Sequence, residues 1–256
     1  MNRDSVRLGD DTLLFIHLPK TGGTALRSAL QDAFEPSQSA FVYGAGDLDE
    51  SISRAAFEAL SDDEIDRLRL VMGHFRYGVH QRIARPYRYA TLVRQPVDRV
   101  VSLYYHYVNL PGVRFLSRNY RERWRLRLRR VTLEDWVFGE RRVTADNLMV
   151  RNVAGVVDLP FGGCTQAVFD HAMENVERDF AGVLVAEEMP QSLAFLGQVL
   201  DRPLSPVGRE NVNPKRPRLA EVGSAAAERI AELNQWDVRF YEEARRRLLD
   251  LDVDPR

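Results

Sequence analysis

Six consecutive residues near the N-terminus have the types best suited to chemistry: Lys20, Thr21, Gly22, Gly23, Thr24 and Ala25. The glycines let the backbone approach a ligand closely. If a helix begins here, its first N–H groups have no partner within the helix. Together with the positive end of the helix dipole, they attract phosphate. The lysine adds a full positive charge and the threonines add hydroxyl donors, so the sequence predicts an anion-binding loop.

The elements that position this loop are expected to alternate between strand and helix. Leu13 to Ile16 is an apolar run typical of a strand, and Leu26 and Leu30 recur at helical spacing after the glycines. The strand–loop–helix unit recurs at 89–107, with strand 89–93. Further strands are expected at 70–74 and 182–186, and 41–43 could add a short one. Further helices are expected at 54–60, 61–69, 132–139, 144–154, 165–178, 189–200, 222–234 and 236–250.

This alternation predicts an α/β fold, with a central parallel β-sheet flanked by helices on both faces, and one domain covering residues 1–256. Parallel sheets bind ligands outside the carboxyl ends of their strands. Lys20, His74, Arg94 and Glu187 all lie at or just past the ends of expected strands. We therefore expect these four side chains to gather on one rim of the sheet.

Composition narrows the classes of function. The 256 residues carry a net charge of −1, which gives no general attraction to nucleic acid or to a membrane surface. The single cysteine, Cys164, excludes an intramolecular disulfide. No apolar run reaches the roughly 18 residues of a membrane span, and the N-terminus lacks a signal-peptide core. We expect a cytoplasmic protein with no membrane span and no nucleic-acid partner.

The predicted loop differs from the P-loop of nucleoside triphosphatases. That motif, G-x-x-x-x-G-K-[ST], carries its lysine near the end, whereas Lys20 precedes the glycines here. No acidic residue follows a strand in the usual position for magnesium, and Glu187 with Glu188 is more typical of a structural pair. The interpretation of the chain as a metal-dependent phosphoryl transferase is therefore weakened, and no metal site is predicted.

Two motifs resemble those of the sulfotransferase family, in the form used by its carbohydrate (heparan-sulfate-type, sulfotransferase family 2-like) branch and by bacterial-type members. His17–Thr24, HLPKTGGT, resembles the 5′-phosphosulfate loop. Leu92–Ser102 resembles the 3′-phosphate motif, with Gln95 where the family usually has aspartate. Gly73–His74 matches a Gly-His pair of that branch. Two further segments are similar to the family: Asp146–Arg151 and Asn234–Glu242.

The resemblance implies a P-loop-containing sulfotransferase fold and 3′-phosphoadenosine 5′-phosphosulfate (PAPS) as co-substrate, without a metal. Lys20 to Ala25 would hold the 5′ end of this donor. Arg94 and Ser102 would hold the 3′-phosphate, which suits the bidentate fork of an arginine. In family members, the segment that closes over the 3′-phosphate corresponds to the one that here carries Lys215, Arg216 and Arg218, and we expect at least one of these to contact the donor.

Sulfuryl transfer needs positioning and charge stabilisation more than covalent chemistry. Lys20 is expected to stabilise the charge that develops on the leaving phosphate. His74 is expected to act as the general base on the acceptor hydroxyl, because imidazole titrates near neutral pH. His80 stays open as a rival base, whereas His17 and His106 are expected to be structural.

The acceptor is expected to be a hydroxyl-bearing carbohydrate or small metabolite, and the oligomeric state stays open. Residues 112–130 carry eight arginines against one glutamate, a local net charge of 8 − 1 = +7. This stretch is a solvated face, a binding surface for an anionic acceptor such as a glycan, or a donor-binding loop. Asn147 and Arg151 either order the wall of the site or touch the acceptor. Arg99 is expected at the surface or in a salt bridge.

The rival function is a nucleotide-binding module, either a kinase-like P-loop protein or a non-catalytic sensor. The spacing of Arg94 and Ser102 favours a ligand with a separate 3′-phosphate, which ATP lacks.

Overall fold

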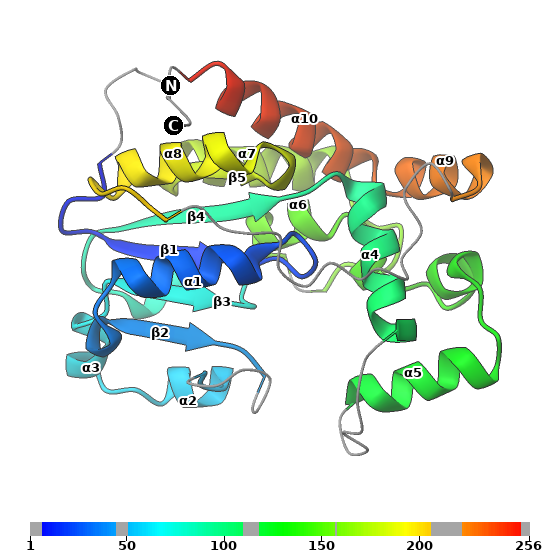
Figure 1. The fold of residues 1–256 in the computed structure, drawn as a ribbon, viewed down its shortest axis with the longest axis horizontal. Helices are drawn as coiled ribbons and strands as arrows, with labels where there is room; N and C mark the ends of the chain where they lie inside the picture. The colour runs from blue at the N-terminus through cyan, green and yellow to red at the C-terminus, as the bar shows by residue number, and fades with distance from the viewer. Residues whose placement is uncertain (1–6, 45–50, 110–117, 157, 206–221, 252–256) are drawn as a thin grey trace.

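A five-stranded parallel sheet forms the centre of the computed structural model, which describes residues 7–44, 51–109, 118–156, 158–205 and 222–251 (Figure 1). The strand order is β2-β3-β1-β4-β5, and each neighbouring pair is parallel. This confirms the predicted fold class, with the short strand near 41–43 at one edge. The strands are β1 (Thr12–Ile16), β2 (Ser39–Val42), β3 (Leu70–Gly73), β4 (Tyr87–Val93) and β5 (Phe180–Val185).

The helices of the described residues are α1 (Gly23–Ala33), α2 (Arg54–Glu58), α3 (Asp62–Asp66), α4 (Pro96–Asn109), α5 (Arg118–Leu128), α6 (Leu148–Ala154), α7 (Gln166–Asp179), α8 (Met189–Val199), α9 (Ser224–Leu233) and α10 (Gln235–Leu249). A π-helical turn covers Asp135–Gly139, and a 3₁₀ turn covers Val143–Ala145. None of the helices that the structure describes combines the length and the apolar character needed to cross a bilayer.

The expected and observed helices differ most where the expected ones are short. Only α3 is helical within the predicted 61–69 segment, although it begins with the predicted capping box. The backbone N–H of Glu64 donates to the Ser61 hydroxyl, and the Ser61 N–H donates to the Glu64 carboxylate at 2.8 Å. The predicted helix at 132–139 is a π-helical turn for most of its length.

Alternate side chains of each strand point to opposite faces of the sheet, and helices cover both faces. Leu13 and Phe15 of β1 pack in one apolar cluster with residues of α1 and α8. Leu14 and Ile16 pack in another with residues of α6, α7 and α10. Figure 1 shows this three-layer arrangement. The central strand is apolar on both sides because both sides are buried.

Helix α4 stands beyond the carboxyl ends of the strands (Figure 1). Its residue Val100 belongs to a third apolar cluster, which also contains Trp136 of the π-helical turn and Ile230 of α9. This cluster attaches the outer helices α5 and α9 to α4 rather than to the sheet. Helix α4 therefore connects the sheet with this third apolar cluster, and the carboxyl ends of the strands face the helix.

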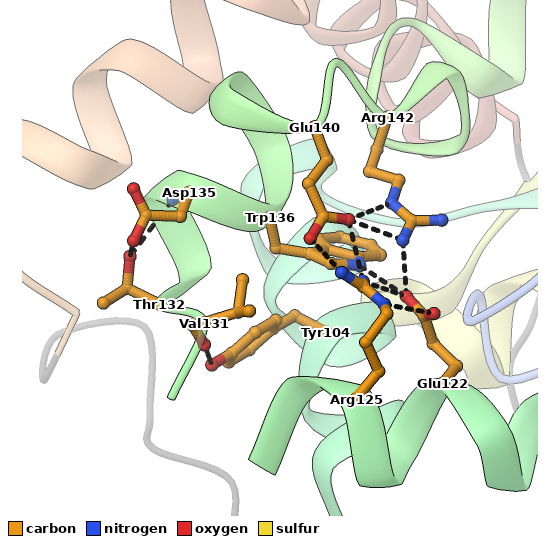
Figure 2. A network of polar contacts seen from close by, with 9 residues as sticks. All are labelled: Tyr104, Glu122, Arg125, Val131, Thr132, Asp135, Trp136, Glu140 and Arg142. Atoms are coloured by element: carbon orange, nitrogen blue, oxygen red, sulfur yellow. Dashed lines mark hydrogen bonds and ion pairs between the residues drawn. The ribbon is translucent and has the colours of Figure 1, made fainter. Parts of the chain in front are cut away.

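The arginine-rich stretch is helical over α5, and one of its arginines is fixed in an ion network (Figure 2). Arg125 donates to both carboxylate oxygens of Glu122 and also to Glu140. Arg142 donates to the same two carboxylates, at 2.6 Å each. The buried Trp136 adds an indole N–H to Glu122 at 3.3 Å. Two carboxylates and two guanidinium groups thus hold α5 against the π-helical turn.

We expect the Glu122→Gln variant to lose about 1 kcal/mol of unfolding free energy, because Arg125 and Arg142 would keep their burial without full charge compensation. Denaturant unfolding measures this loss. Asp250→Asn is the control, since Asp250 pairs with Arg246 where both side chains are about 60% exposed. Its loss should stay below about 0.5 kcal/mol. Equal losses in the two variants would contradict a special role for the network.

The same network predicts a pH dependence. Burial works to raise the pKa of Glu122 and Glu140, but hydrogen bonds and charges from Arg125 and Arg142 outweigh it, and both pKa values are lowered. Their stabilisation is therefore present above the unfolded glutamate pKa of about 4.3 and is lost as the pH falls through the lower folded values. The stability difference between wild type and Glu122→Gln should shrink below about pH 4.

Candidate functional site

The residues that follow four strands meet at one rim of the sheet, as predicted. The His17 N–H donates to the Gly73 carbonyl oxygen at 2.8 Å, which joins the ends of β1 and β3. Arg94, after β4, donates from Nη1 to the Lys20 carbonyl oxygen at 3.1 Å. Glu187, after β5, accepts from the Gln95 N–H at 3.0 Å. Lys20, His74, Arg94 and Glu187 therefore lie along this rim.

The loop after β1 is held in an unusual backbone conformation. Lys20 has φ +70° and Gly22, the N-cap of α1, has φ +91°. The left-handed region costs a lysine energy but costs glycine little. The Thr21 hydroxyl donates to the Leu18 carbonyl oxygen at 2.9 Å, so its hydrogen closes the loop. After this turn the N–H groups of the first turn of α1, Gly23 to Ala25, have no partner within the helix.

Gly23 is required because the imidazole of His17 lies against it. A Cβ atom at position 23 would lie 2.3 Å from His17 Nε2. The ring has little room to move, since it is buried and its Nδ1 is hydrogen-bonded to the Tyr43 hydroxyl at 2.6 Å. The second glycine of the loop thus makes space for a side chain, whereas the first provides the backbone conformation.

We expect Gly23→Ala to destabilise the protein by about 1 to 3 kcal/mol, the usual range for overpacking, and to weaken the binding of adenosine 3′,5′-bisphosphate. Thermal melting and calorimetry measure the two effects. Gly139→Ala is the matched control, because a Cβ there would approach no atom closer than 3.9 Å. An unchanged melting temperature in Gly23→Ala would show that His17 moves aside freely.

Arg94 lies two residues before α4 begins, and Ser102 lies about two turns into this helix. The Arg94 guanidinium forms an ion pair with Asp98 and is mostly buried. Burial lowers the pKa of Arg94, and the charge of Glu187 acts in the opposite direction. Ser102 is buried as well. The arginine is thus a desolvated cation, fixed between the loop of Lys20 and the first turn of α4.

A cavity of about 220 Å³ opens beside these residues. His17 and His74 line it from the sheet, and Leu103 and Tyr107 line it from α4. Two cations, Arg54 and Arg76, also line it, as does Asn152 of α6. The cavity therefore lies between the ends of the strands and α4, with both histidines at its wall.

The structure separates the two rival bases. His74 lines the cavity and is exposed, whereas His80 does not line it. Instead, the Nδ1 of His80 is hydrogen-bonded to the Tyr89 hydroxyl at 2.9 Å, and its ring stacks on Tyr87. That aromatic cluster holds His80 in a structural setting. Of the two histidines, His74 is therefore the one that lines the cavity.

His106, which is expected from the sequence to be structural, lies next to a residue of the cavity wall. It lies one helical turn after Ser102 on α4 and next in sequence to the cavity residue Tyr107. Burial, and then the charge of Lys20, lower its pKa to about 4. The side chain is thus electrostatically coupled to the anion-binding loop. The spacing of four positions between Ser102 and His106 on one helix is the sequence signal that could have indicated this location of His106.

The expectation that Arg99 lies at the surface is wrong, because the side chain is fully buried. Its Nη1 donates to the Thr144 carbonyl oxygen at 3.1 Å. Burial lowers the pKa of Arg99, the charge of Asp237 raises it and that of Arg94 lowers it. The reason is that elements cover α4 on both sides, the 3₁₀ turn at 143–145 among them. A helix face that sequence alone assigns to solvent is therefore interior.

Asn147 and Arg151 order the wall of the site. Arg151 is buried, forms an ion pair with Asp146, and donates to the Leu159 carbonyl oxygen at 2.8 Å. The Asn147 side chain accepts from the N–H groups of Trp236 and Asp237, which fixes α10 to α6. Their hydrogen bonds are thus internal, whereas Leu148 and Asn152 of the same segment line the cavity.

Three predicted donor contacts, Lys215, Arg216 and Arg218, lie outside the described residues. Within the described ranges, no group of three or more His, Cys, Asp and Glu side chains is arranged to hold a metal ion.

Comparison with known proteins gives a family and likenesses to solved structures. The model of the sulfotransferase family matches residues 3–242. The crystal structure of mouse sulfotransferase SULT7A1 complexed with PAP matches over 90% of this chain, with 17% sequence identity and a TM-score of 0.39. This chain spans 65% of the mouse chain. A search of curated proteins found no match.

Proposed function

The chain belongs to the sulfotransferase family, and from this premise we propose that it transfers a sulfuryl group from PAPS to a hydroxyl group. One observation carries the proposal. The hydrogen bond from Arg94 to the Lys20 carbonyl oxygen holds Arg94 beside the loop of Lys20, which supports assigning the 5′ end to this loop and the 3′-phosphate to Arg94. A ligand with phosphate groups on both sides of its ribose fits such a pair of anion sites.

The donor site has a part for each end of the donor. The N–H groups of Gly23, Thr24 and Ala25, at the first turn of α1, bind the 5′ phosphosulfate. Arg94 binds the 3′-phosphate bidentately and gives up its ion pair with Asp98 to do so. Ser102 adds a hydroxyl donor. The assignment of Lys215 and Arg216 as further ligands of the 3′-phosphate rests on the family resemblance alone.

Lys20 and His74 carry the transfer itself. His74 takes the proton of the acceptor hydroxyl as the acceptor oxygen forms its bond to sulfur. The bond between sulfur and the 5′-phosphate oxygen breaks, and Lys20 stabilises the negative charge that develops on that oxygen. The products are a sulfate ester and adenosine 3′,5′-bisphosphate. The exposed His74 then returns its proton to solvent.

The acceptor in this proposal is a carbohydrate or small metabolite that carries negative charge. Arg54 and Arg76 line the cavity next to His74 and supply the complementary charge. Arg54 pairs with Glu58 at 2.7 Å where both side chains are more than half exposed, so exchange for an acceptor anion costs little.

Transfer of labelled sulfate tests this function. The purified protein is incubated with ³⁵S-labelled PAPS and a panel of neutral and anionic sugars and small hydroxyl compounds. We expect label in at least one sulfate ester, with anionic acceptors preferred. A protein that binds the donor but labels nothing across the panel, and releases no free sulfate, would refute the catalytic part of the proposal.

A further inference from the structure

Three aromatic side chains meet where three neighbouring strands end. His17 follows β1, Tyr43 follows β2 and His74 follows β3, and these strands are adjacent in the order β2-β3-β1. The ring centroids of Tyr43 and His74 are 4.7 Å apart, with the planes at 80°. Those of Tyr43 and His17 are 5.6 Å apart, and those of the two histidines 5.1 Å apart. One tyrosine therefore contacts both histidines of the cavity wall.

Tyr43 contacts the two histidines of the cavity wall but is buried and does not itself line the cavity. Its backbone N–H donates to the Ile52 carbonyl oxygen at 3.0 Å, which fixes the chain after β2. The Arg27 guanidinium lies 5.6 Å from its ring centroid, a cation–π contact. The ring is thus held by its own backbone, by Arg27 and by the two histidines.

The hydrogen bond between Tyr43 and His17 joins two neutral groups. Burial raises the pKa of Tyr43, so its hydroxyl keeps its hydrogen. Burial first, and then the charges of His74, Arg27 and Lys20 in that order, together lower the pKa of His17 to about 3. Of the two possible directions of this 2.6 Å hydrogen bond, we take the one in which the phenol O–H donates to the imidazole Nδ1. The hydrogen of His17 is then on Nε2, which faces Gly23.

We propose that Tyr43 is a positioning residue for the transfer, because its hydroxyl fixes His17 as the neutral Nε2–H tautomer while its ring orients His74. The inference rests on the proposed function. A neutral His17 places no positive charge 5.1 Å from His74, which must itself become positive when it takes the acceptor proton. Because Tyr43 holds His17 in this form, His74 is the one of the two histidines that accepts the proton.

The first test is spectroscopic and needs no substrate. Nitrogen-15 NMR of the histidine rings in the wild-type protein should show His17 with an unprotonated Nδ1 and a protonated Nε2 between pH 6 and 8. In Tyr43→Phe the His17 signals should shift toward a mixture of the two neutral tautomers, whereas those of the exposed His171 stay unchanged. Protonation of Nδ1 in the wild type, or an unaltered tautomer in Tyr43→Phe, would overturn the inference.

The second test separates positioning from binding. Release of labelled sulfate from PAPS to water, which serves as the simplest acceptor, gives a rate without a known acceptor. Tyr43→Phe should lower this rate about 3- to 10-fold, the effect of one hydrogen bond, and leave the Kd for adenosine 3′,5′-bisphosphate within about 2-fold. An unchanged rate refutes the role of Tyr43, as does an equal loss of rate and affinity. Absence of bisphosphate binding in the wild type would instead refute the proposed function.

Discussion

Replacing His74 with asparagine is expected to lower the rate of sulfuryl transfer by about 100- to 10,000-fold, the usual contribution of a general base. The side chain lines the cavity at the end of β3 and has a ring nitrogen that asparagine cannot replace as a proton acceptor. Because the anion-binding loop and Arg94 remain in place, the Kd for adenosine 3′,5′-bisphosphate should stay within about 3-fold of wild type.

His80→Asn is the matched control for this result. His80 lies six positions further on, but its hydrogen bond is to Tyr89 and it does not line the cavity. We expect less than a 3-fold change in rate, with a lower melting temperature because the aromatic cluster loses a partner. Full activity in His74→Asn together with inactive, folded His80→Asn would move the base to His80.

Lys20→Met should lower the rate of transfer by about 100- to 1,000-fold, the effect typical of removing one donor to a developing oxyanion. Methionine keeps much of the length of lysine and removes only the charge. Binding of adenosine 3′,5′-bisphosphate should weaken less than the rate falls, because the proposed phosphate ligands, the N–H groups of α1 and the guanidinium of Arg94, are unchanged in this variant. Rates with labelled PAPS and calorimetry with the bisphosphate separate the two effects.

A control for Lys20 must also have positive φ. Arg141, with φ +49°, is exposed and lies outside the site, so Arg141→Met imposes a comparable backbone cost and loss of charge. We expect its rate to equal that of wild type. If Lys20→Met loses rate and affinity to the same degree, then Lys20 binds the donor in the ground state and has no special effect on the transition state.

The sheet and its rim could be predicted because their signals are local. The apolar run from Leu13 to Ile16, with Gly22 and Gly23 a few residues later, predicts a strand and a turn without any knowledge of tertiary contacts. The capping box of Ser61 and Glu64 is a short-range pattern of the same kind, and it is present as predicted. Once the strands are parallel, the positions of Lys20, His74 and Arg94 follow from topology.

Features that depend on distant parts of the chain could not be predicted in this way. Arg99 lies on a helix face that sequence assigns to solvent, and it is buried because the 3₁₀ turn at 143–145, more than forty residues later, covers it. Arg125 pairs locally with Glu122, but its pairing with Glu140, which Arg142 shares, depends on a later part of the chain. Tyr43 belongs to no motif, and its contact with His17 depends on the strand order.

Calorimetry with two nucleotides tests the central claim most directly. The protein is titrated with adenosine 3′,5′-bisphosphate and, separately, with ATP and magnesium, at one salt concentration. The two anion sites joined by Arg94 and Lys20 predict that the bisphosphate binds at least 10-fold more tightly, and that Arg94→Met removes most of this preference. Tighter binding of ATP with magnesium, unaffected by Arg94→Met, would contradict the account and favour a kinase-like nucleotide site.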